Sequence, residues 1–364
     1  MDFEWSEEQE QLRESVRRFL ETHADPARVR AWWEDPHGAP DEVWKGLCEL
    51  GLPGLLVAEA HGGAGLGMLE AGVVLEELGR ALHPGPFLAS SVVATRLVAA
   101  SVDGSQRAAW LSALASGSLR LAVALDAGAE PLRAVRDGAR WRVSGEPGPV
   151  SDAAAAEAWL VPAEADGEVA LFRVERGAAG AACERWDSVD GTRRLFRLAL
   201  DGAPAERLAG DATQALEEAR DLHAIALAAD AVGAAGRALE LSVDYARERE
   251  QFGRPIGSFQ SLQHVLVDML QDLELVRAAT IHALWAADAA PPAERREAAA
   301  VAKAAAAEAF PRLGRAAIQV HGGIGFTWET DIHLFDKRLC SQALLGGGAA
   351  LHLETLARAA IDRP

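Results

Sequence analysis

Two segments of this chain carry the residues whose types and spacing could do chemistry. The first reads Tyr-Ala-Arg-Glu-Arg-Glu-Gln-Phe-Gly-Arg-Pro-Ile-Gly-Ser-Phe-Gln-Ser-Leu-Gln-His from Tyr245 to His264. The second reads Gln-Val-His-Gly-Gly-Ile-Gly-Phe-Thr-Trp-Glu from Gln319 to Glu329. An arginine fork and backbone amides suit phosphate oxygens, and a glutamine amide suits an adenine edge or a hydroxyl. These residue types therefore fit a nucleotide-phosphate site.

Both segments also have a simpler interpretation. The first is typical of a helix end, a turn at Gly253, Pro255 and Gly257, and a new helix. The second is typical of a helix end whose glycines expose backbone amides beside Gln319. The local chemistry of the residues alone favours this simpler interpretation, in which both segments are helix ends that carry solvated charges.

Periodicity predicts helices on both sides of a smaller β region. Ser6 and Gln9 form a capping box before the first helix, and further helices are expected at 41–50, 69–82 and within 105–116. Short alternating runs predict strands at 119–125, 140–144, around 159–161, 169–174 and 194–200. From residue 211 onward, long helices are expected, including 259–288 and 293–321. The predicted fold class is α+β, with an N-terminal α-helical domain (1–117), a middle β-domain (118–208) and a C-terminal α-helical domain (209–364).

Composition excludes several classes of protein. The 364 residues carry a net charge of −18, which argues against a nucleic-acid partner. The three cysteines are far apart and offer no metal-ligand spacing, so no metal site is predicted. No apolar stretch reaches the length of a membrane span, and the acidic N-terminus does not read as a leader. We therefore expect a cytoplasmic protein with no membrane partner.

The two segments resemble the signature of the acyl-CoA dehydrogenase family of flavoproteins. The shared pattern is Arg-x-x-Phe-Gly followed by Phe-Gln, and later Gln-x-x-Gly-Gly-x-Gly-Phe; supporting matches lie at 50–55, 61–63 and 74–80. The resemblance implies a middle β-barrel or sandwich, a C-terminal four-helix bundle, and FAD bound between subunits. The residues that match the family's contacts to the adenosine diphosphate half of FAD are Arg249, Gln251, Phe252, Gln260, Gln319, Gly322 and Gly323.

The positions that match the family's catalytic base are not carboxylates. In the family reaction a glutamate removes the α-proton of an acyl-CoA thioester while a hydride leaves to the flavin. Counting along the chain, one family position for this glutamate is Gly346 and the other is His223. A histidine can act as a base near neutral pH, but packing in a partly polar interior is the favoured interpretation of His223. No catalytic residue is assigned to this chain.

The middle region departs from the family in the same way. Residues 124–131 lack the Thr-Glu-Pro and Gly-Ser-Asp stretch that holds flavin and acyl-CoA, and 141–144 corresponds loosely to a second ring-contacting segment. The features that this chain lacks are thus the family's contacts to the flavin ring and its catalytic base, whereas the residues that match the contacts to the ADP half of FAD are present. This division resembles heteromers of the family, including α2β2 dehydrogenases of actinobacterial steroid side-chain breakdown, whose Asp-x-Thr-Arg segment is similar to residues 187–194.

The resulting interpretation is a partner subunit that lends its ADP-binding half to a homologous catalytic acyl-CoA dehydrogenase subunit. The resemblance implies an acyl-CoA substrate, such as a steroid side-chain CoA ester, and an electron-transfer flavoprotein as acceptor. One alternative is a homomeric flavoenzyme that needs no glutamate, such as a flavin monooxygenase, which fits the missing base. A scaffold that binds neither flavin nor thioester is the other alternative, and the intact segments around Arg249 and Gln319 argue against it.

Overall fold

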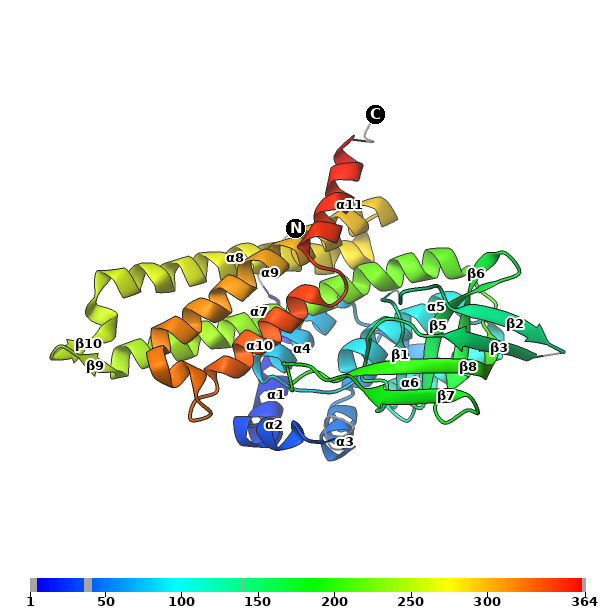
Figure 1. Ribbon diagram of the computed structural model, residues 1–364, viewed down its shortest axis with the longest axis horizontal. Coiled ribbons are helices and arrows are strands. Elements are labelled where there is room, and N and C mark those ends of the chain that lie inside the picture. The colour runs from blue at the N-terminus through cyan, green and yellow to red at the C-terminus, as the bar shows by residue number, and fades with distance from the viewer. Residues whose placement is uncertain (1–4, 36–40, 127, 139, 362–364) are drawn as a thin grey trace. The chain divides into compact units, whose positions relative to one another are not determined.

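The computed structural model describes residues 5–35, 41–126, 128–138 and 140–361 (Figure 1). Its contacts divide the chain into two compact units. Unit 1 contains the described residues up to Arg30, the stretch Gly72–His83 and the chain from Ala224 onward. Unit 2 contains Ala31–Ala71 and Pro84–His223. The domain boundaries expected after residues 117 and 208 stay predictions, because this division is by contacts and not by position along the chain.

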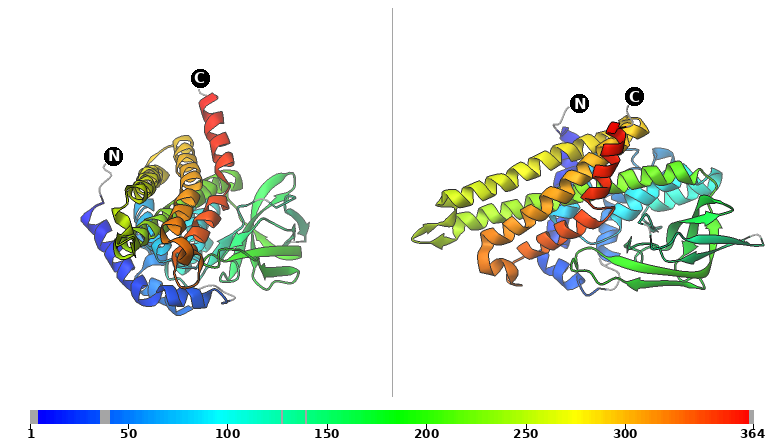
Figure 2. Two further views of the ribbon diagram at one scale, coloured as in Figure 1. Left: turned by 60° about the vertical axis from the view of Figure 1, so that its left-hand side comes forward. Right: turned by 45° about the horizontal axis from the view of Figure 1, so that its top comes forward.

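Unit 1 is helical. Its elements, some of which begin or end in unit 2, are α1 (Glu7–His23), α2 (Pro26–Trp32), α4 (Met68–Arg80), α7 (Ala212–Glu248), α8 (Gln260–Ala289), α9 (Pro292–His321), α10 (Ile332–Leu344) and α11 (Ala349–Ile361), with the short turns η4 (Ile256–Ser258) and η5 (Gly322–Phe326). The capping box at the start of α1 is confirmed, since Gln9 N donates to Ser6 Oγ and Ser6 N donates to Gln9 Oε1. Within unit 1, side-chain contacts join α7 to α9 and to α10, and α8 and α10 pack against α9 (Figures 1 and 2).

Two glycines allow α4 and α7 to cross at close range. A Cβ atom on Gly79 would lie 1.9 Å from the Asp230 carbonyl oxygen, and one on Gly233 would lie 1.8 Å from the Glu76 carbonyl oxygen. Each distance is shorter than any van der Waals contact, so both positions require a residue without a side chain. Small residues on the contact face of a helix permit such a close crossing.

A buried ion pair joins α7 to α10 inside unit 1. The Arg338 guanidinium donates to the Asp230 carboxylate, with Nη1 3.1 Å from Oδ1, and to the His83 carbonyl oxygen at 3.2 Å. Gln342 donates to the same carboxylate from the next turn of α10. Both charged side chains are buried, at 0% and 3% exposure for Arg338 and Asp230. The pair therefore stabilises the bundle only while both partners are present.

Unit 2 combines short helices with a curved sheet. Its helical elements are η1 (Leu52–Gly54), η2 (Glu59–His61), α3 (Asp41–Glu49), the π-helical η3 (Phe87–Ala94), α5 (Thr95–Ser101) and α6 (Gly104–Ala115). Its strands are β1 (Leu121–Val123), β2 (Arg133–Asp137), β3 (Arg140–Gly145), β4 (Val150–Ser151), β5 (Ala158–Ala165), β6 (Glu168–Glu175), β7 (Ala181–Arg185) and β8 (Leu195–Arg207). The two-residue strands β9 (Glu250–Gln251) and β10 (Arg254–Pro255) belong to unit 1.

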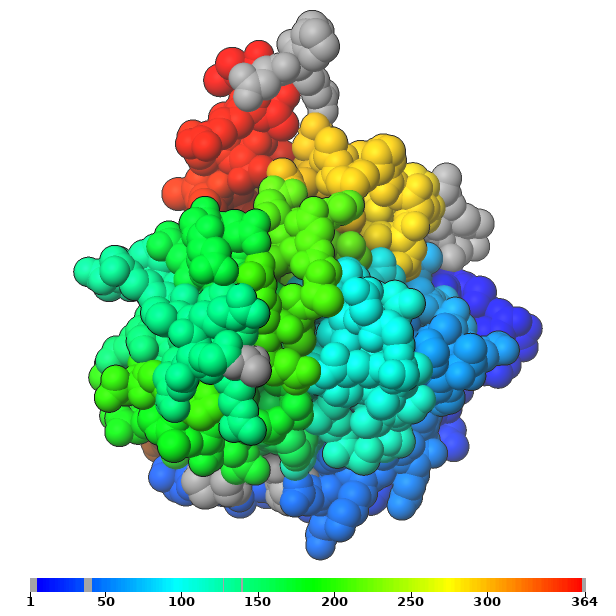
Figure 3. Space-filling model, turned by 90° about the vertical axis from the view of Figure 1, so that its right-hand side faces the viewer, coloured from blue at the N-terminus to red at the C-terminus, as the bar shows by residue number. Residues whose placement is uncertain are grey.

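The sheet of unit 2 closes on itself. The pairings of β2 with β3, β3 with β8, β8 with β6, β6 with β5 and β5 with β2 form a ring. Trp159, Trp141 and Phe172 fill its interior, and the Trp159 indole donates to the Ala153 carbonyl oxygen at 2.9 Å. Helix α6 lies beside β6 and β8, where Arg173 stacks on Trp110 at 4.7 Å and Gln106 donates to Glu206. In Figure 3 the cyan surface of the short helices adjoins the green surface of the later part of unit 2. The predicted α+β class, with helical regions flanking a β-barrel or sandwich, is confirmed.

Several elements were absent from the sequence-based expectation. Strand β2 exposes four of its five residues, so it lacks the apolar alternation of a half-buried strand. Strand β4 has two residues, and β7 buries none fully. Every residue of the π-helical segment η3 is buried, so its sequence has no polar face to reveal a period.

Among the described residues, α7 alone has the length and apolar composition that could cross a membrane. Of its most apolar window, 89% is buried inside the protein. A core helix of a bundle has this property, and composition by itself does not separate the two cases.

Candidate cofactor-binding site

The first predicted segment forms a tight hairpin at the end of α7. The Arg249 amide still donates to the Tyr245 carbonyl oxygen at 2.8 Å, and the Ile256 amide returns to the Arg249 carbonyl oxygen at 2.7 Å. Between them, Gln251 of β9 pairs with Arg254 of β10. Gly257 then passes close to the last turn of α7, since a Cβ there would lie 2.9 Å from the Ala246 carbonyl oxygen. These contacts hold the base of the hairpin against the last turn of α7.

Phe252 and Gly253 make the two-residue turn of this hairpin. Both have positive φ values, 56° and 76°, as a type I′ turn requires. Glycine adopts this conformation freely, whereas a phenylalanine there costs of order 1 kcal/mol or more. The Phe252 side chain is 91% exposed and contacts the Phe259 ring edge-on, with 6.1 Å between centroids. The Arg254 guanidinium lies over the same Phe259 ring at 4.1 Å.

The second predicted segment forms the end of α9 and the turn η5. The Gly322 amide caps the helix by donating to the carbonyl oxygens of Gln319 and Ile318. A Cβ atom on Gly325 would lie 2.7 Å from the Ile318 carbonyl oxygen, so the turn folds back tightly onto the helix. No atom lies within 4 Å of a Cβ built on Gly323, and Gln319 is exposed. The glycines thus leave open space above the turn.

Tyr245 and His321 connect the two segments. Their rings stack with 4.5 Å between centroids and an interplanar angle of 20°. This contact holds the last turn of α7 against the last turn of α9, so both predicted segments lie at one end of the bundle. Sequence analysis did not single out either aromatic residue, because only the packed helices bring positions 76 residues apart into contact.

The side chains of the predicted ADP contacts are available on this surface. Arg249, Gln251, Phe252, Gln260, Gln319 and Gly323 are exposed, and Gly322 is partly buried. Within the part of the chain that the structure describes, the Arg249 guanidinium forms no hydrogen bond or ion pair. An unpaired fork beside open glycine backbone is the donor set that a diphosphate requires. The residues present therefore fit the ADP half of FAD.

Burial lowers the pKa of His321, and the hydrogen bond between its Nδ1 atom and the Ala317 carbonyl oxygen partly opposes this effect. A depressed folded-state pKa means that the unfolded chain binds the proton first as the pH falls. The stability contributed by neutral His321 is thus fully present above about pH 6.5 and is lost as the pH falls through the lower folded-state pKa.

We therefore expect His321→Phe to flatten the pH dependence of stability below about pH 6.5. The wild type should lose stability more steeply than the variant as the pH falls, by no more than the limit for one proton, about 1.4 kcal/mol per pH unit. Denaturant unfolding at several pH values measures it, with the exposed His264→Phe as control. Parallel curves for wild type and His321→Phe would contradict the assignment.

The loop that contains Gly346 is held by a buried lysine. Lys303 of α9 is 1% exposed, and its Nζ atom donates to the carbonyl oxygens of Gln342, Ala343 and Gly347 at 3.0, 3.2 and 3.0 Å. His352 of α11 contacts the Gly346 carbonyl oxygen at 2.9 Å through Nε2. Gly346 itself adopts a positive φ of 66°, which favours glycine. This first family position for a base is therefore a backbone turn.

His223, the second family position, lines a small cavity in unit 2. The cavity has a volume of about 10 Å³, and its walls include Val93, Leu125, Asp126 and Ser151. A space of this size holds at most one water molecule. His223 and Asp126 each have polar or electrostatic contacts within the protein. Sequence analysis did not single out Ser151, because β4 is too short to be recognised.

A second, larger hollow lies on the sheet of unit 2. It is a groove of about 920 Å³ between the β1–β2 and β3–β4 loops, and it includes Gly128, Glu130, Ser144, Trp186 and Arg197. A Cβ atom on Gly128 would lie 2.0 Å from the Glu146 carbonyl oxygen, so the two loops touch at this point. Ser144 of the loosely matched segment 141–144 faces this groove, whereas Trp141 packs in the core.

The segment 187–194 has a structural role. Thr192 donates from its amide to Asp190 Oδ1 at 2.8 Å, and Arg194 donates to the carbonyl oxygens of Gly191 and Trp32. A Cβ atom on Gly191 would collide with the Trp33 indole. These contacts fasten the Trp32–Trp33 stretch to the sheet within unit 2.

An α+β fold that presents an unpaired arginine fork and open glycine amides at one end of a helix bundle fits a protein that binds a nucleotide-phosphate cofactor. Family models make the assignment specific. The "Acyl-CoA dehydrogenase, N-terminal domain" matches residues 6–118, and the "Acyl-CoA dehydrogenase, C-terminal domain" matches residues 211–361. The chain belongs to the acyl-CoA dehydrogenase family. It is therefore an oxidoreductase that acts on acyl-CoA, and its cofactor is FAD.

Similar proteins include an acyl-CoA dehydrogenase and chains of two solved structures. Acyl-CoA dehydrogenase IpdE2 of Mycobacterium tuberculosis is 37% identical over 93% of this chain and 93% of its own length. One chain of the ChsE4-ChsE5 complex from Mycobacterium tuberculosis is 30% identical over the whole of both chains, with a TM-score of 0.94. A chain of a Tcur3481-Tcur3483 steroid ACAD variant is 33% identical over 98% of both chains, with a TM-score of 0.90.

Proposed function

We propose that this chain is a subunit of a heteromeric FAD-dependent acyl-CoA dehydrogenase. It contributes the ADP-binding half of a shared FAD site through Arg249, Gln251, Phe252, Gln260, Gln319, Gly322 and Gly323. The catalytic base belongs to a homologous partner subunit. The observation that carries this proposal is the unpaired, exposed Arg249 guanidinium at the start of the hairpin, at the same end of the bundle as the open glycine turn that follows α9.

The absence of a base in this chain is supported at both family positions. Gly346 has no side chain, and the carbonyl contacts of Lys303 fix the turn that surrounds it. The cavity beside His223 has a volume of about 10 Å³, which is smaller than any thioester. A proton acceptor must reach the α-carbon of the substrate, and neither position presents one to a ligand of that size.

The roles of this chain's residues follow from their chemistry. When bound, FAD accepts the hydride that leaves the β-carbon of the acyl-CoA. Arg249 supplies a permanent positive charge and a planar fork for the diphosphate. The amides near Gly322 and Gly323 offer further donors, and the Gln260 and Gln319 amides can orient an adenosine edge. Together these residues hold the cofactor at one end, and the proton and hydride transfers occur in the partner's half of the site.

The substrate class and the partner follow from similarity. The relatives named above include a two-component complex and an enzyme described as a steroid ACAD. We propose the same class here: a CoA ester of a steroid side chain, an α2β2 assembly with a glutamate-bearing homologue, and an electron-transfer flavoprotein as acceptor. No feature of the site specifically favours the monooxygenase alternative.

The assembly can be tested by expression with and without the partner. Expressed alone, the chain should purify without flavin absorbance, since it holds only half of the cofactor. Co-expression with a homologous chain that carries the glutamate should give a complex with bound FAD and acyl-CoA dehydrogenase activity. Addition of FAD to the single chain serves as the control for cofactor lost in purification. A single-chain preparation that holds stoichiometric FAD and oxidises acyl-CoA would falsify the proposal.

A further inference from the structure

One arginine of the N-terminal region grips the chain directly after the η5 turn. Arg30 of α2 donates from Nε to Asp331 Oδ1 at 2.8 Å and from Nη2 to the Thr330 carbonyl oxygen at 2.6 Å. Its Nη1 atom donates to the Trp328 carbonyl oxygen, and the guanidinium lies 5.7 Å from the centre of the Trp328 ring. These residues all belong to unit 1.

The gripped segment is bonded in turn to the glycine turn. The Thr327 amide and hydroxyl donate to the Ile324 carbonyl oxygen at 3.0 and 2.9 Å. The Thr330 hydroxyl donates to the same oxygen at 3.2 Å. Ile324 lies within η5, one residue beyond Gly323. A continuous series of hydrogen bonds therefore runs from the Arg30 guanidinium to the turn that presents the glycine amides.

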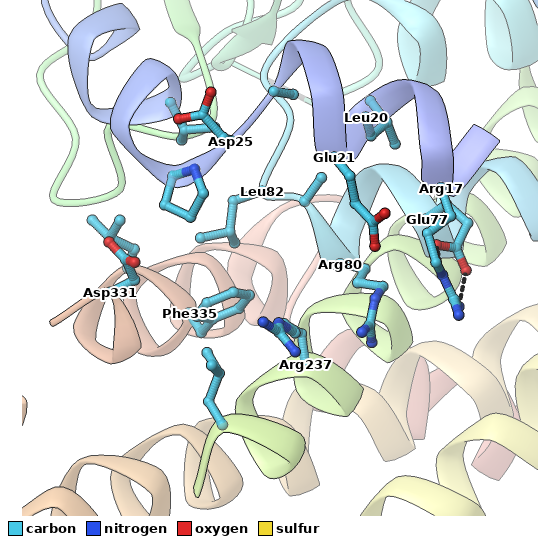
Figure 4. A pocket seen from close by; sticks show the side chains of 16 residues that line it. Arg17, Leu20, Glu21, Asp25, Glu77, Arg80, Leu82, Arg237, Asp331 and Phe335 are labelled. Carbon is cyan, nitrogen blue, oxygen red and sulfur yellow. Dashed lines mark hydrogen bonds and ion pairs between the residues drawn. The ribbon is translucent and has the colours of Figure 1, made fainter. Parts of the chain in front are cut away.

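A cavity lies between α2 and the start of α10. The cavity has a volume of about 240 Å³. Its walls include Pro26 and Val29 on the α2 side, and Asp331, Leu334 and Phe335 on the α10 side (Figure 4). Beside this cavity, the Arg30 hydrogen bonds join α2 directly to the loop after η5.

We propose that Arg30 is a positioning residue for the FAD site. It fixes residues 322–331 so that the Gly322 and Gly323 amides and the Gln319 side chain meet the ADP half of the cofactor in one arrangement. This inference depends on the proposed function. Three acceptors in different directions require a planar fork, so lysine cannot replace the contacts of Arg30. The effect on FAD is indirect, because Arg30 contacts the loop and not the proposed ADP-binding residues.

The test compares Arg30→Lys with Arg28→Lys in the complex with its partner. Arg28 lies on the same helix, but it contacts the Thr22 carbonyl oxygen and Asp25 and does not touch the loop. Apo complexes are titrated with FAD, and amide hydrogen exchange is followed over residues 322–331. Arg30→Lys should weaken FAD binding by about tenfold, the loss of roughly one charge-assisted hydrogen bond, and should speed exchange in the loop. Arg28→Lys should change FAD affinity by less than about twofold.

Two further variants separate a positioning role of Arg30 from a role in anchoring α2, and test the proposed cofactor site itself. Asp331→Asn keeps the backbone acceptors and weakens one contact, so it should give a smaller shift in the same direction if Arg30→Lys does not fold. Arg249→Ala tests the proposed function in the same assay. If Arg249→Ala weakens FAD binding but Arg30→Lys and Asp331→Asn do not, Arg30 only anchors α2 and the positioning role is wrong. If Arg249→Ala also has no effect, the proposed cofactor site itself is wrong.

Discussion

Asp230→Leu is expected to destabilise the protein by about 3–5 kcal/mol, the usual cost of breaking a buried ion pair by removing one partner. The Arg338 side chain is fully buried, and in the variant it keeps its charge but loses this carboxylate. Gln342 loses the same acceptor. The damage falls where α4 and α7 cross most closely, since the Asp230 carbonyl oxygen also faces Gly79. Denaturant unfolding of wild type and variant measures the change in the free energy of unfolding.

The double variant Asp230→Leu/Arg338→Met separates charge from packing. Removing both charges leaves no unpaired buried guanidinium, so the double variant should be more stable than Asp230→Leu alone. Asp268→Leu, which removes an exposed carboxylate from α8, is the matched control and should change stability by less than about 0.5 kcal/mol. A double variant that is less stable than Asp230→Leu would show that the ion pair does not dominate the loss.

Arg249→Ala is expected to have the largest effect on the cofactor. A charged contact to a diphosphate contributes about 1.5–3 kcal/mol net, which corresponds to a roughly ten- to a hundredfold weaker FAD affinity. With the partner left unmutated, FAD content and activity of the complex should fall together. Excess FAD should partly restore activity, because under the proposed assembly the groups that carry out proton and hydride transfer remain in the partner. Titration of FAD into the apo complex measures the dissociation constant.

Arg247→Ala provides the control for Arg249→Ala. Arg247 lies one half-turn earlier on α7, is 75% exposed and pairs with Asp244 at 3.6 Å. Its removal should leave FAD affinity unchanged. A structural role for Arg249, by contrast, would lower the melting temperature with and without flavin equally. Equal FAD dissociation constants for wild type and Arg249→Ala would remove the main support for a cofactor role of this chain.

The sequence predicted the helical parts of the fold better than the sheet. Helices α8 and α9 were expected within a few residues of their observed bounds, because their apolar and small residues recur with a helical period. The strand β2 was not expected, since four of its residues face solvent and are mostly charged. Its place is set by pairing with β3 and β5, and such pairing is not visible in a short run of residues.

The same limit applies to the candidate site. The identities of Arg249, Gln319 and Gly322 were readable as motifs, because each motif is local in sequence. The contacts that organise them were not. The stacking of Tyr245 on His321 and the hydrogen bond from Arg30 to Asp331, 301 residues away, depend on how the helices pack. Sequence patterns therefore identified the candidate cofactor-binding residues, whereas the structure identified the residues that hold the candidate site together.

The left-handed backbone conformation of Phe252 bears on the stability of copies of this chain that have not assembled with a partner. An isolated copy carries the conformational cost of that turn, of order 1 kcal/mol, together with an aromatic ring left in water. Under the proposed assembly, the partner subunit and the cofactor cover this tip, and their binding energy offsets the cost. Unassembled copies would then be the ones that unfold and meet proteases first. The amount of this chain would follow the supply of its partner, with no dedicated regulator required.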